Sequence, residues 1–316
     1  MSAPISPFPA SVAEELSDPQ KFTARFLHPS KYPVVQRAGV DPEGAFGFAA
    51  AMAGTDPETL RRYQGEFADE VRASAALLPP DAASRLPFAP GDAIVALGDS
   101  ITDDSLSWAY QLEAYLELQR PGSGIRVLNA GITAHTTQQA IARIDRLIAL
   151  KPDWVIQLLG TNDARRHGAL RVQMQSIGET QRNLAHLAEL IAAETGATLV
   201  AMTPPPVVEA DADAWEPFQG ERITWREADV AAVAEAVRQQ ASGRGALVDL
   251  HTAFERASVD ASAELLLPDG VHPTVAGQRL ILETLLQALA QAPELKGELR
   301  TEGEHTHDDR TSPATT

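Results

Sequence analysis

Short apolar runs alternate with longer amphipathic stretches from about residue 93 to about residue 290 of the 316-residue chain. Five apolar runs have the length of β-strands, and they cover residues 93–97, 125–131, 154–160, 198–202 and 246–250. Apolar positions between and after them repeat with helical spacing, over residues 107–118, 137–150, 181–194, 226–240 and 274–289. Apolar strands separated by helices are typical of a parallel sheet with helices on both faces.

This alternation limits the arrangement of the strands. Right-handed crossovers between parallel strands favour a flavodoxin-like strand order for such a chain. We therefore predict an α/β fold with a doubly wound five-stranded parallel sheet, formed by a domain of residues 92–292.

The first 91 residues do not follow the same alternation. Residues 56–78 instead place apolar side chains at helical spacing, after Thr55 or Asp56 as a helix cap. These side chains are Leu60, Tyr63, Phe67, Val71, Ala75 and Leu78. The proline-rich residues 77–92 predict a linker into the sheet. We expect residues 1–91 to form a helical extension that packs on the main domain, and residues 293–316, which lack apolar periodicity, to be a disordered tail.

Composition and charge exclude several classes of function. The chain carries 43 acidic and 26 basic side chains, a formal net charge of -17, which repels phosphate backbones and anionic lipids. We therefore expect neither a nucleic-acid partner nor a membrane partner. The chain has no cysteine, which excludes disulfides and cysteine nucleophiles. Its first residues lack a secretory signal and no run is long enough to span a membrane, so a cytoplasmic location is predicted.

Polar residues whose side chains could take part in catalysis follow the predicted strands. In a doubly wound sheet the ligand site lies beyond the carboxyl ends of the strands, so these residues are expected to meet at one edge. The segments concerned are Gly98–Ser100, Asn129–Gly131, Gly160–Asp163 and, before the last helix, Asp269–His272.

Each segment also has an interpretation without catalysis. Ser100 is a favoured helix cap, and Asn162 with Asp163 is a common turn pair. Gly131 alone is typical of a turn, as is the pair formed by Asp269 and Gly270. These interpretations would all have to coincide at successive strand ends.

The four segments together resemble the SGNH hydrolases, also called GDSL esterases and lipases. GDSIT at 98–102, NAGIT at 129–133, GTND at 160–163 and DGVHP at 269–273 occur in the order of that family, over about residues 93–291. The resemblance implies a serine esterase without a cofactor or a metal.

The resemblance also implies roles for single residues. Ser100 would be the nucleophile, His272 the general base and Asp269 the residue that orients His272. The oxyanion hole would consist of the backbone N–H groups of Ser100 and Gly131 and the side-chain amide of Asn162. One departure is Ala134, which stands where a glycine is common in the family.

The residue types support these roles on physical grounds. A serine hydroxyl is a weak nucleophile until a base accepts its proton, and histidine titrates in the suitable range. Asp269 is close enough in the chain to reach the ring nitrogen of His272 that does not face Ser100. An amide donor such as Asn162 stabilises the negative charge that develops on the substrate oxygen.

The substrate is less well defined by the sequence. His135, Arg165, Arg166 and His167 follow the second and third strands and are expected to border the cleft, as contacts to a carboxylate or a sugar. A loop with Trp215 and Phe218 is expected to act as a lid. The alternative is that both loops are solvated surface segments. An acyl ester, including an acetylated sugar, is the expected small-molecule partner.

Three other functions remain open from the sequence. An acyltransferase would use the same residues and pass the acyl group to an alcohol. A metal-dependent phosphoesterase has similar Gly-Asp turns but needs more histidine and aspartate ligands. A non-catalytic binding module is open to any fold.

Overall fold

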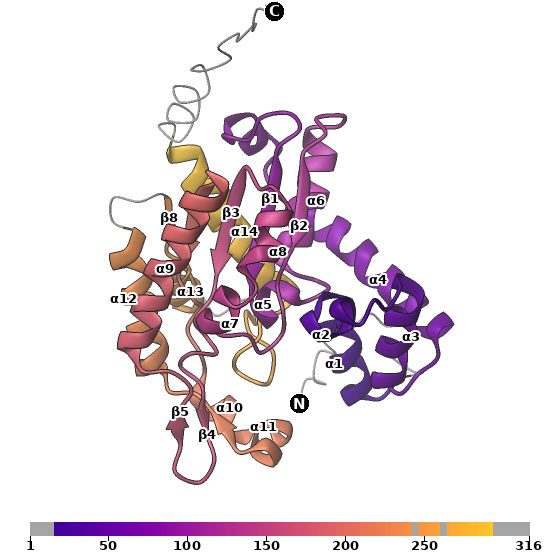
Figure 1. The fold of residues 1–316 in the computed structure, drawn as a ribbon, viewed down its shortest axis with the longest axis vertical. Helices are drawn as coiled ribbons and strands as arrows, with labels where there is room; N and C mark the ends of the chain where they lie inside the picture. Colours follow the sequence, from indigo (N-terminus) through magenta and orange to yellow (C-terminus); the bar gives the residue numbers. More distant parts are fainter. Residues whose placement is uncertain (1–15, 242–245, 260–263, 293–316) are drawn as a thin grey trace, which may run out of the picture.

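The computed structural model describes residues 16–241, 246–259 and 264–292 (Figure 1). Its central sheet has five parallel strands, in the order β2 (Arg126–Asn129), β1 (Ala93–Gly98), β3 (Trp154–Leu158), β6 (Thr198–Met202) and β8 (Ala246–Val248). Counted along the chain, this is the flavodoxin-like order with its switch point at β1 and β3. The predicted fold class is confirmed.

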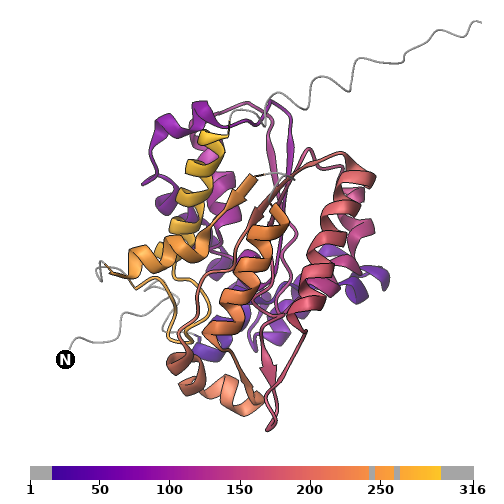
Figure 2. The same ribbon diagram turned by 90° about the vertical axis from the view of Figure 1, so that its left-hand side faces the viewer.

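Helices cover both faces of this sheet (Figure 2). One face carries α7 (Thr137–Ile141), α8 (Ile144–Ala149), α9 (Ile177–Thr195) and α12 (Glu227–Ala241). The other carries α6 (Trp108–Gln119), α13 (Leu250–Val259) and α14 (Val275–Gln291). Along β1, Val95 and Leu97 pack on the first face and Ile94 and Ala96 on the second. Because both faces are covered, every residue of β1 is buried, which explains its continuous apolar run.

The N-terminal extension is helical, as predicted. Its elements are α1 (Asp18–Phe26), the 3-10 helix η1 (Pro29–Lys31), α2 (Pro33–Arg37), α3 (Pro42–Met52), α4 (Pro57–Ala75) and the 3-10 helix η2 (Pro80–Arg85). Asp56 caps α4, whose apolar stripe is buried against α6 and α14. The expected tail, residues 293–316, lies outside the described residues.

The segment expected to be a linker, residues 77–92, is part of the core. Leu86 and Phe88 are buried, and the Phe88 ring packs edge-on against Trp154 at the start of β3. Arg120 at the end of α6 donates to the Phe88 carbonyl. The prolines shape this segment, but its apolar side chains fix it to the domain.

The loops after β3 and β6 form a small layer of their own. Short strands β5 (Val172–Gln173), β4 (Arg166–His167) and β7 (Ile223–Thr224) pair antiparallel, beside α10 (Glu209–Ala214) and α11 (Glu216–Glu221). Phe218 and Trp225 are buried there together with Val271. The aromatic loop is therefore packed under the segment that carries His272, and it is not a solvated surface loop.

Two predicted elements differ from the structure. The helix expected over residues 137–150 is broken into α7 and α8 at Arg143, whose guanidinium donates to the carbonyls of Ala130 and Gly98 at 2.5 and 3.0 Å. The last strand ends at Val248, because Asp249 accepts hydrogen bonds from Thr252 and starts α13. None of the helices in the described ranges has the length and apolar content needed to cross a membrane.

Candidate active site

Ser100 lies at the turn from the central strand β1 into the short helix α5 (Ser100–Asp103). Gly98 is required at the end of β1, because a Cβ there would lie 2.1 Å from Thr102 Oγ1 and 3.0 Å from the Leu158 carbonyl. The cap of α5 is Asp99, whose Oδ1 accepts the N–H of Ile101 at 3.0 Å. Asp99, and not Ser100, is therefore the cap of this helix, and the Ser100 hydroxyl is free for another contact.

The hydroxyl of Ser100 meets the ring of His272. His272 Nε2 lies 2.9 Å from Ser100 Oγ, and His272 Nδ1 lies 2.6 Å from Asp269 Oδ2. Asp269 Oδ1 also accepts the backbone N–H groups of Val271 and His272, both at 2.9 Å. The structure thus joins Asp269, His272 and Ser100 in one chain of hydrogen bonds, although 172 residues separate the serine from the histidine.

A tight loop holds Asp269 and His272 together. The N–H of Leu267 donates to the His272 carbonyl, and Gly270 adopts a left-handed conformation with φ of 67°. A Cβ at Gly270 would lie 2.5 Å from the carbonyl of Val208. The glycine of the DGVHP segment is therefore needed both for its backbone angle and for close packing.

The charges of Asp269 and His272 suit the use of His272 as a general base. Burial alone would lower the pKa of His272, but the charge of Asp269 and the hydrogen bond to it outweigh burial and raise the pKa. Burial alone would raise the pKa of Asp269, and the charge and hydrogen bond of His272 lower it. The ionised carboxylate fixes the proton on Nδ1 and leaves the Nε2 lone pair of the neutral ring facing Ser100.

The expected oxyanion donors do not all have free hydrogens. Within the described residues, the backbone N–H of Ser100 makes no hydrogen bond. The amide of Asn162 donates one hydrogen to the His135 carbonyl at 3.2 Å and keeps the second. The N–H of Gly131, however, donates to Asn129 Oδ1 at 2.9 Å. The expectation that Gly131 offers its N–H to a substrate does not fit this hydrogen bond.

Ala134, three residues later, has the properties that Gly131 lacks. Its φ of 66° is left-handed, which is where glycine would be favoured. Its N–H makes no hydrogen bond to any described residue. The same loop is tied to the site on both sides, because Ile132 N–H donates to the Gly98 carbonyl and the His135 carbonyl accepts from Asn162.

The four expected substrate contacts separate into two groups. Arg165 donates to Asn162 Oδ1 at 3.3 Å and to His167 Nε2 at 2.9 Å. Arg165 therefore lies next to the Asn162 amide, and His167 is bound to Arg165 there. His135 is in the same group, and burial together with the charge of Arg143 lowers its pKa to about 4. Arg166 instead forms a two-pronged ion pair with Asp229 at 2.6 and 2.9 Å.

His272 is also surrounded by residues of the N-terminal extension that no sequence pattern identifies. The rings of Phe26 and Phe22 lie 4.6 and 5.7 Å from the His272 ring, centroid to centroid. Arg25 of the same helix is fully buried and donates to the carbonyl of Pro273, which follows His272. The two phenylalanines are four residues apart, so they share a helix face, but no motif connects that face with a histidine far along the chain.

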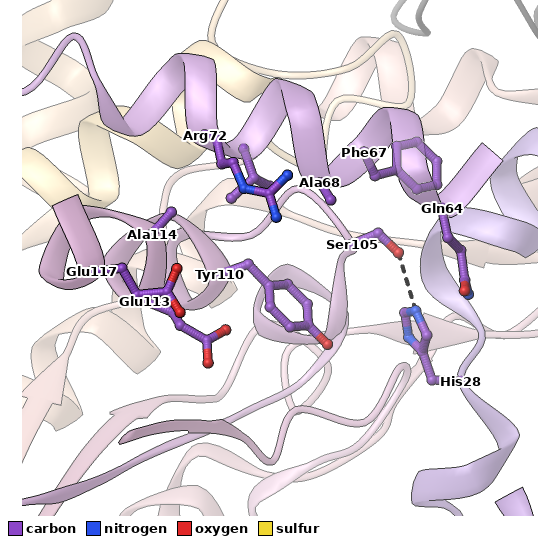
Figure 3. Close-up of a pocket in the computed structure, with 11 residues that line it drawn as sticks. His28, Gln64, Phe67, Ala68, Arg72, Ser105, Tyr110, Glu113, Ala114 and Glu117 are labelled. Carbon is purple, nitrogen blue, oxygen red and sulfur yellow. Dashed lines mark hydrogen bonds between the residues drawn. The ribbon is translucent and has the colours of Figure 1, made fainter. Parts of the chain in front are cut away.

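A second Ser-His-Asp contact lies beside a cavity of about 380 Å³ between α4 and α6 (Figure 3). His28 Nε2 lies 3.1 Å from Ser105 Oγ, and His28 Nδ1 lies 2.9 Å from Asp103 Oδ1. The Ser105 hydroxyl also lies 3.1 Å from the Arg25 carbonyl, which competes with His28 for its single proton. The Ser105 N–H is bound to the same carbonyl. This cluster therefore lacks the free N–H that Ser100 has, and its hydroxyl is shared with a backbone carbonyl.

No group of three or more histidine, cysteine, aspartate or glutamate side chains in the described part of the chain could hold a metal ion. The charged groups around Ser100 are instead paired with each other or bound to backbone groups. Asp163, for example, accepts the N–H and the hydroxyl of Thr137.

Comparison with known proteins adds an independent finding. Residues 96–280 match the model of the GDSL-like Lipase/Acylhydrolase family. An acetylxylan esterase from Geobacillus stearothermophilus is 26% identical, over 63% of this chain and 94% of that protein.

Solved structures share the fold. The crystal structure of an acetylxylan esterase from Geobacillus stearothermophilus matches with a TM-score of 0.53 at 24% identity, over 65% of this chain and 96% of that one. An alpha/beta hydrolase enzyme from the metagenome of Lake Arreo, Spain, matches with a TM-score of 0.53 at 23% identity, over 65% of this chain and 97% of that one. The family match covers all four segments that follow the strands.

Proposed function

The chain belongs to the GDSL-like lipase/acylhydrolase family and is a carboxylic ester hydrolase, and we propose that Ser100, His272 and Asp269 perform the hydrolysis through an acyl-enzyme. The observation that carries this proposal is the unbroken chain of hydrogen bonds from Asp269 through His272 to the Ser100 hydroxyl. The free backbone N–H of Ser100 at the start of α5 supports it.

The first half of the reaction acylates the serine. As Ser100 Oγ attacks the acyl carbon, its proton moves to His272 Nε2, and Asp269 stabilises the resulting imidazolium. The negative charge that develops on the carbonyl oxygen is bound by the N–H of Ser100 and the free amide hydrogen of Asn162. His272 then gives its proton to the oxygen of the departing alcohol, and the C–O bond of the ester breaks.

The second half uses water in place of the alcohol. His272 accepts a proton from the water, whose oxygen attacks the acyl carbon of the acyl-enzyme. Collapse of this intermediate releases the carboxylic acid, and the proton returns from His272 to Ser100 Oγ. The enzyme is then ready for the next ester.

We assign the third oxyanion donor to the N–H of Ala134 in place of Gly131. The Ala134 N–H makes no other hydrogen bond within the described residues, whereas Gly131 is bound to Asn129. Ala134 also lies between Ile132, whose N–H donates to the Gly98 carbonyl of β1, and His135, whose carbonyl accepts from Asn162. Arg165 holds Asn162 Oδ1 and the His135 carbonyl accepts one amide hydrogen, so the side chain is fixed and its second amide hydrogen stays available for the substrate.

The substrate that we propose is a short-chain ester, with an acetyl group on a sugar as the leading candidate. Ser100 and His272 are each only 6% exposed, and such restricted access favours a small acyl group over a long one. A relative of this chain is named an acetylxylan esterase. His135 is half-buried beside Asn162, and because its pKa is lowered to about 4 its ring is neutral at physiological pH, which suits a hydrogen bond with a sugar hydroxyl.

Two serines of this chain make a matched test. Ser100→Ala is expected to lower kcat for p-nitrophenyl acetate and for acetylated xylo-oligosaccharides by about 10³-fold or more, with the melting temperature unchanged. Ser105→Ala, which removes the other histidine-bound hydroxyl, is expected to keep the activity. A fluorophosphonate should label Ser100, as mass spectrometry of the labelled peptide would reveal.

The outcomes separate the alternatives. Full activity in Ser100→Ala would contradict the proposal, as would labelling at Ser105 alone. An acyltransferase would make more acylated alcohol than free acid when an alcohol is added to the water. Activity that disappears with a strong chelator and resists the fluorophosphonate would point to a metal-dependent phosphoesterase instead.

A further inference from the structure

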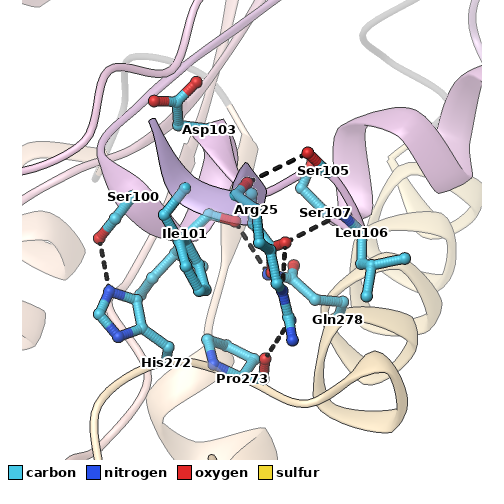
Figure 4. Close-up of polar contacts among 12 residues, drawn as sticks. Arg25, Ser100, Ile101, Asp103, Ser105, Leu106, Ser107, His272, Pro273 and Gln278 are labelled. Carbon is cyan, nitrogen blue, oxygen red and sulfur yellow. Dashed lines mark hydrogen bonds and ion pairs between the residues drawn. The ribbon is translucent and has the colours of Figure 1, made fainter. Parts of the chain in front are cut away.

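Helix α1 reaches the loop of His272 and the helix that begins at Ser100. Arg25 Nε and Nη2 donate to the two carboxylate oxygens of Asp104, both at 2.7 Å, and Nη2 donates to the Pro273 carbonyl at 3.2 Å (Figure 4). Pro273 follows His272 in the chain, and Asp104 follows α5. One fully buried guanidinium therefore ties the histidine loop to the serine turn.

The next residue of α1 packs directly on the histidine ring. The Phe26 ring is fully buried and lies 4.6 Å from the His272 ring at an interplanar angle of 45°. Phe22, one helical turn earlier, lies 5.7 Å away at 77°. Tilted and edge-on contacts of this kind are the favoured geometries for aromatic pairs. They leave the imidazole little freedom to turn away from Ser100.

The same segment holds the loop after β2. Lys31 Nζ donates to Asn129 Oδ1 at 3.1 Å and to Asp103 Oδ1 at 2.7 Å. The Phe26 carbonyl accepts the hydroxyl of Thr133, the residue before Ala134. Residues 18–31 thus contact three of the four loops that carry the proposed catalytic groups, namely those of Ser100, Ala134 and His272.

The residues that the extension contributes to these contacts, Phe22 to Lys31, all lie before the part of the chain that matches the family model, which starts at residue 96. The acetylxylan esterase relative is aligned over 94% of its own length and 63% of this chain. About a third of this chain lies outside the alignment with that relative, and the extension lies outside the family match, so we treat it as a separate contribution to the site.

We infer that Arg25 and Phe26 of the N-terminal extension are positioning residues, which set the place and the orientation of His272 for the reaction. This inference rests on the proposed role of His272 as the general base. Misplacing a catalytic group by about 1 Å can cost about 10²-fold in rate, so such contacts act on kcat more than on substrate binding. The extension is then a working part of the active site.

The rings of Phe22 and Phe26 also affect the pKa of His272. The charged and titratable groups that face the ring are Asp269 on its own loop, Asp99 and Asp104 at the two ends of α5, and Arg25 on α1. Phe26 keeps water from the imidazolium, which disfavours the charged form. Opening this side to water is therefore expected to raise the pKa of His272. Because the base must be neutral, the acid limb of kcat/KM would move to higher pH.

Two variants of the full-length chain test this inference, each with a matched control. Phe26→Leu removes the ring but stays apolar, and Phe46→Leu makes the same change on α3, where the ring packs near Arg61. Arg25→Lys keeps the charge but cannot span both Asp104 oxygens and the Pro273 carbonyl. Arg61→Lys is its control, since Arg61 pairs with Glu43 at the exposed surface.

We expect Phe26→Leu and Arg25→Lys to lower kcat for p-nitrophenyl acetate by about 10- to 100-fold, with KM within about threefold of the wild type. The acid limb of Phe26→Leu should move to higher pH, and both control variants should match the wild type. Unchanged kcat and pH profile in both variants would overturn the inference. So would losses of kcat that only follow the unfolded fraction in a melting curve.

A measurement without substrate separates this inference from the proposed function. The ring protons of His272, assigned by their loss in His272→Gln, report its pKa by NMR, and the proton on Nδ1 reports the bond to Asp269. Phe26→Leu is expected to raise that pKa and Arg25→Lys to shift the Nδ1 proton signal. If the wild type cleaves no ester, the proposed function fails, and these signals still decide whether α1 positions His272. Signals equal to those of the controls would overturn the inference.

Discussion

Asp99, beside the proposed nucleophile, is buried with one unsatisfied oxygen. Its Oδ1 accepts the Ile101 N–H, but its Oδ2 has no hydrogen-bond partner among the described residues. Burial raises the pKa of Asp99 to about 7, against the opposing effects of the Ile101 bond and the charge of His272. The folded protein thus holds a proton that the unfolded chain releases. The resulting stability is fully present below the usual pKa of 3.8 and is lost as pH rises through about 7.

Asp99→Asn should remove this pH dependence. The amide keeps the oxygen that caps α5 and has no charge to bury. Each pKa unit between the folded and unfolded states corresponds to about 1.4 kcal/mol. Urea unfolding at pH 5 and pH 8 should therefore show that the wild type loses about 2 to 3 kcal/mol more than the variant between these two pH values. Equal losses in the two proteins would mean that Asp99 is ionised at pH 5 in the folded state.

The oxyanion donors illustrate what the sequence can and cannot predict about single residues. The contact of Ser100, His272 and Asp269 could be predicted, because the chemistry of these side chains identifies them in four ordered segments. A backbone N–H carries no such identity. Whether Gly131 or Ala134 has a free N–H depends on the rotamer of Asn129, which only the folded loop defines.

At the scale of elements, Gly131 matters for how the loop after β2 packs on α5. A Cβ at this position would lie 2.5 Å from the Asp103 nitrogen and 2.8 Å from the Thr102 carbonyl carbon. Backbone atoms of a buried helix cannot move away cheaply. We expect Gly131→Ala to lower the free energy of unfolding by about 1 to 3 kcal/mol and to lower kcat, because the loop that carries Ala134 shifts.

The control for this prediction is Gly65→Ala in α4. No atom lies within 4 Å of its added Cβ, so the variant should be more stable than the wild type by about 0.5 to 1 kcal/mol. Urea unfolding and kcat for p-nitrophenyl acetate measure both variants. Since alanine keeps the N–H, a Gly131→Ala enzyme with wild-type stability and activity would return Gly131 to the set of oxyanion candidates.

Elements with long periodic patterns were predicted well, and those set by distant contacts were not. The five strands and the helix at residues 57–75 follow directly from apolar spacing. The break between α7 and α8 depends on carbonyls of other segments that bind Arg143. The two-residue strands β4, β5 and β7 are too short for any pattern, and they form only because the loops after β3 and β6 meet.

At the scale of the whole molecule, the extension and the sheet share one hydrophobic core. Phe67 of α4, Leu86 of the proline-rich segment and Trp108 of α6 belong to the same buried cluster, which continues to Leu285 of α14. A boundary at residue 91 therefore describes the sequence pattern, while the packing is continuous across it. Such continuity predicts that the two parts unfold together.

The four tryptophans allow this to be measured, since Trp108, Trp154, Trp215 and Trp225 all lie after the extension. Phe67 is 2% exposed, and Phe67→Ala should cost about 3 to 5 kcal/mol. If the core is shared, Phe67→Ala should lower the urea midpoint by the same amount in two measurements. One is tryptophan fluorescence, and the other is circular dichroism, which also reports the extension. Phe48→Ala is the control, because Phe48 is 50% exposed on α3 and its loss should move neither midpoint appreciably.

The opposite result would have a definite structural meaning. If Phe67→Ala moved an early circular-dichroism transition and left the tryptophan transition in place, residues 16–91 would unfold as a unit of their own. Helix α1 could then leave His272 while the sheet stayed folded, and kcat would fall at urea concentrations below the tryptophan midpoint. With a shared core, activity and tryptophan fluorescence are instead lost together, because Arg25 and Phe26 stay on the histidine loop until the sheet itself unfolds.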